Sequence, residues 1–171
     1  LLFSTYKDVD CIMIPWVMMA CNHREKNPPS LLQGIVHRWD HDKKHPHSKK
    51  WKKGRCRYDE IEVKSIFKGE AASKIDIHHP RAYKERIMAI DSVYNNAKPI
   101  RPLYKGLHET EIAHARMLCF HYRIFSKEEC ARKLEGSKLA GYKEASFADL
   151  WVTDYAEKEE TFLREKSIRN L

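Results

Sequence analysis

The chain has 171 residues, of which 42% are apolar and 33% are charged, and its formal net charge at pH 7 is +8. This length suits one domain or a small domain with extended arms, and the 18 aromatic residues argue for a folded core and against a disordered chain. No apolar run reaches the roughly 18 residues that a membrane-spanning helix needs, so no transmembrane segment is expected.

The first predicted elements lie on either side of the break Asn27-Pro28-Pro29. The apolar residues 9–21 fit a buried strand and a short helix equally well, because periodicity does not separate the two. After the break, Ser30 and Gln33 have the spacing of a capping box, which marks the start of a helix. An apolar stripe of helical spacing extends this helix over residues 31–42, and it consists of Leu31, Leu32, Ile35, Val36 and Trp39.

The middle of the chain predicts one hairpin and one helix. Residues 60–67 and 74–78 alternate in part between apolar and polar side chains, and a turn with Gly69 separates them, as in a β-hairpin. Pro80 can open a helix, and apolar residues at helical spacing extend it to about residue 94. Pro99 and Pro102 then predict a rigid linker.

The C-terminal third predicts further helices. The sequence HETE at 108–111 places acid where a helix N-terminus favours it, and an apolar stripe continues this helix to Phe125. Ser126 and Glu129 form a second capping box, for a helix that ends near Gly136. Residues 147–171 predict a last helix with a charged tail.

These elements predict a mainly α fold, an elongated helical protein with one small β-hairpin and an extended basic arm. We expect residues 1–29 to form an N-terminal extension and residues 30–58 to hold the capped helix and the basic arm with its histidines and tryptophans. Residues 59–171 would form the hairpin and a helical domain with a charged C-terminal tail. The five cysteines are odd in number and widely scattered, so free thiols are expected. Cys11 and Cys21 have the spacing of a CX9C motif, but the other candidate pair does not.

Histidines raise the question of a metal site. His37, His41 and His45 lie four residues apart, and HRWDH is similar to the zinc-binding HxxEH pattern with Asp in place of Glu. On the predicted helix they fall opposite the apolar stripe and face outward beside lysines. No third ligand is identifiable, so we expect no bound metal and no cofactor.

A second histidine pattern raises the question of a nuclease. The sequence DIHHP at 76–80 resembles the strand-end motif of HNH nucleases, a family that also needs an Asn on a loop and a further His on a helix. Asn95 or Asn96, and then His108, could complete such a set. A predicted helix replaces the usual loop and CxxC pairs are missing, so a noncatalytic protein is the preferred interpretation.

The most basic stretch, HRWDHDKKHPHSKKWKKGRCR, spans residues 37–57 and holds nine Lys or Arg residues against Asp40 and Asp42. This local +7 is nearly the whole excess of the chain, and such a block favours a polyanionic partner. Cations neutralise phosphates and tryptophans stack on unpaired bases, whereas no DNA-binding motif is present, so we predict RNA binding. The residues expected to contact RNA are Arg38, Trp39, Lys43, Lys44, Lys49, Lys50, Trp51, Lys52, Lys53, Arg55 and Arg57.

Residues 84–135 resemble the L-forty family of mitochondrion-specific large-subunit ribosomal proteins. The matching features are a basic amphipathic segment with Arg86 and Ile87, the linker Pro99-Ile100, and the acidic start Glu109-Thr110-Glu111. The resemblance covers under a third of the chain and implies a structural component between ribosomal RNA and neighbouring ribosomal proteins.

Together these patterns predict a structural, noncatalytic subunit of a ribonucleoprotein assembly, the mitochondrial ribosome, in the mitochondrial matrix. Its partners would be ribosomal RNA and ribosomal proteins, with no small-molecule substrate. The alternatives are an accessory subunit of a mitochondrial respiratory membrane complex and, behind it, an HNH-like metal-dependent nuclease.

Overall fold

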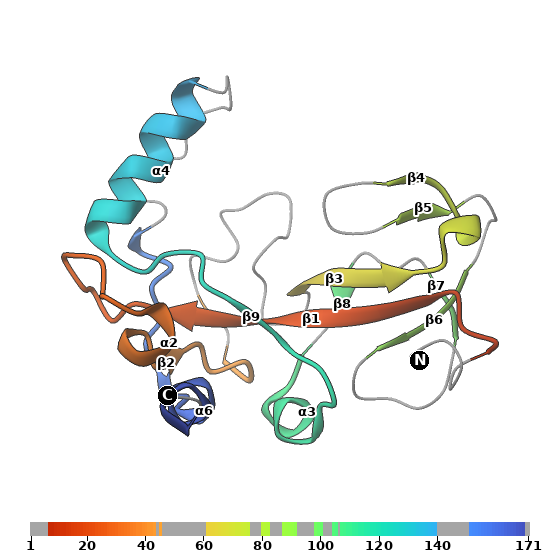
Figure 1. Cartoon of the computed structure of the whole chain (residues 1–171), viewed down its shortest axis with the longest axis horizontal. Helices are drawn as coiled ribbons and strands as arrows, with labels where there is room; N and C mark the ends of the chain where they lie inside the picture. Colours follow the sequence, from red (N-terminus) through yellow and green to blue (C-terminus); the bar gives the residue numbers. More distant parts are fainter. Residues whose placement is uncertain are drawn as a thin grey trace. The chain divides into compact units, whose positions relative to one another are not determined.

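The structure is a computed structural model, in which the chain forms two compact units (Figure 1). Unit 1 comprises residues 1–16 and 41–119, and unit 2 comprises residues 17–40 and 120–171. The residues that the structure describes are 7–43, 45, 61–75, 80–82, 87–91, 98–100, 104–105, 107–139 and 151–169.

The long strand β1 (Cys11–Ala20) supplies residues to both units, its first six to unit 1 and its last four to unit 2. Nine of its ten residues are apolar, Pro15 is the tenth, and all are buried except the partly buried Ile14. A strand buried on both faces has a continuous apolar run with no alternation. Residues 9–21, which fitted a strand and a helix equally, therefore contain a strand.

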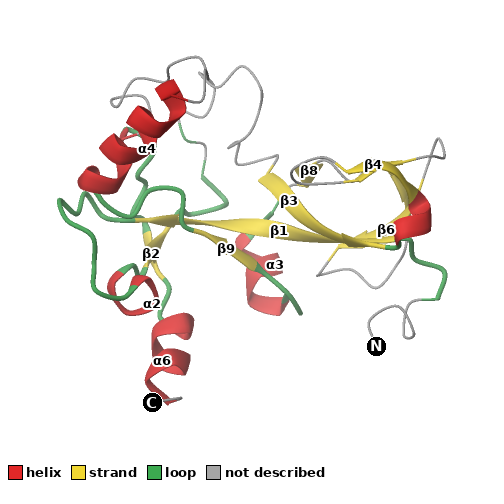
Figure 2. Ribbon diagram, turned by 45° about the horizontal axis from the view of Figure 1, so that its top comes forward, coloured by secondary structure: helices red, strands yellow, loops and turns green. Residues whose placement is uncertain are grey.

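Unit 1 is built mainly of strands (Figure 2). Besides the first part of β1, its elements are β3 (Ile61–Phe67), η2 (Gly69–Ala71), β4 (Ala72–Ile75), β5 (Pro80–Ala82), β6 (Ile87–Asp91), β7 (Lys98–Ile100), β8 (Tyr104–Lys105) and α3 (Glu109–His114). In the main sheet, β1 pairs antiparallel with β3 and parallel with β6. The sheet continues on one side with β8, which is antiparallel to β3, and on the other side with β7, which is antiparallel to β6. β4 and β5 form a separate antiparallel pair.

The core of unit 1 lies on both faces of β1. Cys11 and Met13 pack with Val63 of β3 and Ala89 of β6, and Phe67 covers this cluster. On the other face Ile12 packs with Val9 and Ile90, against Met117. Burying side chains of this size stabilises the fold by about 1.5–3 kcal/mol each.

The described residues of unit 2 form short strands around the end of β1 and the helices α2, α4 and α6. After the end of β1, its elements are α2 (Leu31–Gly34), β2 (His37–Arg38), the last two residues of β9 (Cys119–His121), α4 (Lys127–Leu139), β10 (Lys158–Glu159) and α6 (Phe162–Arg169). β2 pairs antiparallel with β1 on one side and with β10 on the other. α2 and α6 lie side by side (Figure 2).

The prediction of a mainly helical chain is wrong. The described residues form ten strands and four α-helices, and α4 alone among these helices exceeds eight residues. The predicted helix over 31–42 ends at Gly34, and the Ser30 side chain caps no amide. Ile35 is buried, Val36 accepts a hydrogen bond from the Glu160 amide at 2.6 Å, and the next two residues join the sheet as β2. Strand pairing therefore overrides the helical spacing.

The predicted helix from residue 80 to about 94 is also wrong. Its described residues form β5 and β6, and β6 lies between β1 and β7 in the sheet. Ile87 and Ile90 are β-branched residues that suit a strand as well as an amphipathic helix, and pairing on both sides satisfies the β6 backbone. The predicted linker at Pro99 includes strand β7, and Pro102 lies outside the described residues.

Three further predictions are corrected in part. β3 forms as predicted, but its partners are β1 and β8. The described residues of 74–78 belong to β4, which pairs with β5, so the described residues do not form the predicted hairpin of 60–67 with 74–78. The helix that begins at HETE is α3, which ends at His114. The segment predicted as a last helix contains helical Trp151, strand β10 and α6 in place of one continuous helix.

The second capping box correctly marks a helix start. α4 begins directly after Ser126, whose Oγ accepts a hydrogen bond from the Glu129 amide at 2.9 Å. α4 continues through Gly136 to Leu139, slightly beyond the predicted end. Among the described residues, no helix has the length and apolarity that crossing a membrane requires.

Candidate functional site

The basic stretch of the sequence begins with two residues that are built into unit 2. Trp39 is 2% exposed and packs edge-to-face on Tyr155, with ring centroids 5.1 Å apart. Arg38 is 8% exposed, its Nε lies 3.4 Å from Glu160 Oε2, and its Nη1 donates to the Trp39 carbonyl. Both side chains, predicted to contact RNA, therefore pack inside their own unit.

The next residues attach to α3 in unit 1. The His41 amide donates to Glu109 Oε1 at 2.8 Å, and the Glu109 amide donates to Asp42 Oδ1 at 3.2 Å. Asp42 Oδ1 also lies 3.2 Å from Nδ1 of His108, at the N-terminal end of α3. A carboxylate in this position is stabilised by the helix dipole. These contacts fix the beginning of the basic stretch to the start of α3.

The histidines do not face outward as the sequence predicted. His41 and His45 are 1% and 3% exposed, because the predicted helix that would have turned them to solvent does not form. His37 is partly exposed in β2. Across the described part of the chain, no group of three His, Cys, Asp or Glu side chains could hold a metal ion.

Of the five residues weighed for a nuclease, the structure describes His108 alone. His78, His79, Asn95 and Asn96 lie outside the described residues, and His108 is engaged with Asp42.

Of the other predicted RNA contacts, Lys43 is described and exposed. The rest lie outside the described residues, and they are Lys44, Lys49, Lys50, Trp51, Lys52, Lys53, Arg55 and Arg57. Residues 43–57, called the basic segment below, contain eight Lys or Arg residues and no Asp or Glu. The buried His45 near its start and strand β3 after its end both belong to unit 1.

Positive charge is concentrated in this segment. The residues of unit 1 include 19 Lys or Arg and 12 Asp or Glu, which gives a net charge of +7. Unit 2 includes 13 Lys or Arg and 12 Asp or Glu, which gives a net charge of +1. Without the eight basic residues of the segment, unit 1 has 11 Lys or Arg and 12 Asp or Glu, which gives a net charge of −1. The remainder of each unit is therefore close to neutral.

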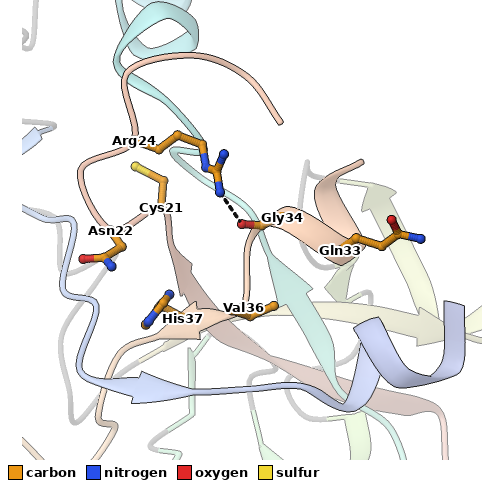
Figure 3. Close-up of a pocket in the computed structure, with 7 residues that line it drawn as sticks. All are labelled: Cys21, Asn22, Arg24, Gln33, Gly34, Val36 and His37. Carbon is orange, nitrogen blue, oxygen red and sulfur yellow. Dashed lines mark hydrogen bonds between the residues drawn. The ribbon is translucent and has the colours of Figure 1, made fainter. Parts of the chain in front are cut away.

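Unit 2 contains a cavity of about 430 Å³ that the sequence did not predict (Figure 3). Its lining comes from the turn after β1, from α2 and from the chain entering β2, and consists of Cys21, Asn22, Arg24, Gln33, Gly34, Val36 and His37. Arg24 Nη2 donates to the Gly34 carbonyl at 3.0 Å. No carboxylate lies among the lining residues.

Asp154 fixes the turn after β1, which contributes Cys21 and Asn22 to the lining of this cavity. Its side chain is fully buried and accepts hydrogen bonds from the amides of Cys21 and His23, at 2.6 and 2.7 Å, and from the Cys21 thiol at 3.2 Å. Asn22 and His23 have φ values of 52° and 54°, in the left-handed region that few residues other than glycine and asparagine enter readily. The carboxylate thus holds a strained turn in place.

The described thiols are all free and none is activated. Burial, together with the nearby Asp154 carboxylate, raises the pKa of Cys21 to about 12, and burial raises the pKa of Cys11 to about 11. Burial also raises the pKa of Cys119 and of Cys130. Because the thiolate is the nucleophilic form, these raised pKa values make the four thiols poor nucleophiles near neutral pH.

Comparison with known proteins returned no match. No family model matches the chain, and neither a curated protein nor a solved structure matches it significantly.

Proposed function

We propose that the protein is a noncatalytic RNA-binding subunit of a ribonucleoprotein assembly, and that the basic segment at 43–57 is its RNA contact. The observation that carries this proposal is the charge distribution. Eight cations and no anion lie within fifteen consecutive residues, and the remainder of both units is nearly neutral. Such a segment neutralises phosphates and releases their counterions, which gives affinity without sequence preference.

The attachment of the segment to unit 1 supports this role. The described residues on either side of it are anchored: His41 and Asp42 contact Glu109, and β3, which begins at Ile61, pairs with β1 and β8. A segment flanked on both sides by anchored residues loses less conformational entropy on binding than a free tail does. Trp51 adds a surface on which an unpaired base can stack.

The burial of Arg38 and Trp39 removes these two residues from the proposed RNA contact. Their contacts inside unit 2 give both side chains a structural role, so the proposal rests on the basic segment alone.

The resemblance to the L-forty family gives the mitochondrial ribosome as the candidate assembly. The acidic start at Glu109–Glu111 does open a helix, α3, but β6 and β7 occupy the region where the resemblance implies a helix and a linker. The basic segment therefore supports RNA binding more directly than the resemblance supports a particular particle.

The test measures the affinity of the full chain for a single-stranded RNA of mixed sequence. The test variant replaces Lys49, Lys50, Lys52 and Lys53 by Gln. The control replaces four exposed lysines outside the segment, Lys7, Lys26, Lys74 and Lys127, and so removes the same charge. We expect a loss of affinity of at least about tenfold in the test variant and a change below about threefold in the control. Equal losses in the two variants would refute a localised RNA contact.

A further inference from the structure

We propose that the cavity of unit 2 lined by Arg24, Asn22 and His37 is a binding site for the phosphate group of a small molecule of mononucleotide size. The site consists of residues that the RNA-binding proposal does not use, so the two proposals stand independently. Its volume of about 430 Å³ lies in the range of small-ligand sites, roughly 300–1,000 Å³.

The lining of the cavity has the chemistry of an anion site. Arg24 supplies a full positive charge, Asn22 supplies an amide donor and His37 supplies an imidazole, whereas the Gln33 side chain points away from these three (Figure 3). No Asp or Glu belongs to the lining that the structure describes. Two carboxylates lie near the lining. Glu159 is opposite His37 in the β2–β10 pair, with its Oε1 3.9 Å from Arg164 Nη1, and the buried Asp154 carboxylate accepts hydrogen bonds from the amides of Cys21 and His23.

Arg24 is held in position before any ligand arrives. Its amide donates to the Cys21 carbonyl at 3.3 Å, its carbonyl accepts from the Lys127 amide at 2.9 Å, and its Nη2 donates to Gly34. A guanidinium has five N–H donors, and this contact with Gly34 uses one of them. The others remain available for the oxygens of a phosphate, whose geometry suits the planar fork of arginine.

The wall that faces Arg24 is equally well defined. Gly34 lies against Pro28 so closely that an added Cβ would overlap the proline ring. The left-handed backbone at Asn22 and His23, fixed by Asp154, sets the opposite side of the cavity. A site whose donors are placed in advance spends less binding free energy on ordering them.

The test is a titration of the full chain with adenosine monophosphate, followed by NMR or calorimetry. The four segment lysines at positions 49, 50, 52 and 53 are replaced by Gln in every sample, so that the basic segment does not bind the probe. We expect saturable binding, weaker binding of inorganic phosphate and no binding of adenosine, which lacks the phosphate. If inorganic phosphate binds as tightly as the nucleotide, the ligand is the free anion and the nucleotide-size assignment is wrong. Absence of saturable binding by either phosphate compound overturns the proposal.

Two variants assign the binding to the cavity. Arg24→Gln should weaken binding at least about tenfold, because a charge-assisted contact is lost. Asn22→Asp should also weaken it about tenfold, since it places a carboxylate beside the phosphate without altering Arg24. Lys26→Gln, which removes an exposed cation outside the lining, serves as the matched control and should leave binding unchanged. Equal effects of Lys26→Gln and Asn22→Asp would show that binding depends on general charge and not on this cavity.

Discussion

At the scale of single residues, Asp154 joins the end of β1 to a segment more than a hundred residues later in the chain. Its buried carboxylate satisfies two backbone amides of the turn at 21–23 and one thiol. A buried acceptor of this kind is costly to lose, because the donors then remain buried without partners. Nothing in the local sequence around Asp154 predicts this role, since it depends on contacts with residues far away in the chain.

Replacement of Asp154 by Asn should lower the free energy of unfolding by about 2–3 kcal/mol. The side-chain NH2 group of Asn would face the backbone amides and the thiol that donate to the carboxylate in the native chain, and two donors cannot satisfy each other. Denaturant unfolding followed by tryptophan fluorescence measures the change. Glu135→Gln, an exposed position on α4, is the control and should shift the free energy by less than about 0.5 kcal/mol. A similar effect of both substitutions would contradict the role assigned to Asp154.

Cys21 provides a second prediction at this scale, through its reactivity. With a pKa raised from 9.0 to about 12, its thiolate fraction near neutral pH is about a thousandfold lower than that of an ordinary thiol. We expect iodoacetamide labelling of Cys21 in the folded chain to be slow and to rise about tenfold per pH unit from about pH 8 to about pH 10. Mass spectrometry of labelled peptides measures the rate. A labelling rate that levels off near pH 9 would mean that the carboxylate of Asp154 does not suppress ionisation.

At the scale of elements, strand pairing decided most of the outcomes that the sequence left open or predicted wrongly. The stripe over residues 31–42 has helical spacing, yet Gly34 ends α2 and the following residues pair with β1 and β10. β6 likewise has the spacing of an amphipathic helix and becomes a strand between β1 and β7. Such pairings are non-local and leave no mark in a short window of sequence.

The starts of α3 and α4 were predicted correctly because their signals are local. The amide of His108 donates to Glu111 Oε2 at 2.8 Å, and Ser126 Oγ accepts from the Glu129 amide. The end of α3 was not predictable, since the residues after His114 continue the apolar stripe while the chain leaves the helix and enters β9.

Two glycines provide a matched pair of substitutions at the element scale. Gly34→Ala should destabilise the fold by about 1–3 kcal/mol, because the new methyl group would overlap the Pro28 side chain. Gly136→Ala places the same methyl group in open space on α4 and should stabilise the fold by up to about 1 kcal/mol through helix propensity. Thermal unfolding of both variants measures the difference. Destabilisation by both would show that the contact at Gly34 is not the cause.

At the scale of the whole molecule, the two units differ in the charge that they carry. The charge excess was visible in the sequence, and so was its concentration near residue 50. The sequence did not reveal that Arg38 and Trp39 belong to the interior of unit 2, because that depends on their contacts with Glu160 and Tyr155. The cavity was equally hidden, although an asparagine in a turn directly after an apolar strand was a weak local signal for a left-handed backbone.

The central claim, that the basic segment binds RNA through its phosphates, is tested most directly by the salt dependence of binding. Each phosphate neutralised on a single strand contributes about −0.7 to the slope of log K against log salt concentration. Replacing Lys49, Lys50, Lys52 and Lys53 by Gln should therefore reduce the magnitude of the slope by about 2 to 3, and the control set Lys7, Lys26, Lys74 and Lys127 should leave it unchanged. An unchanged slope and affinity in the segment variant would contradict the account.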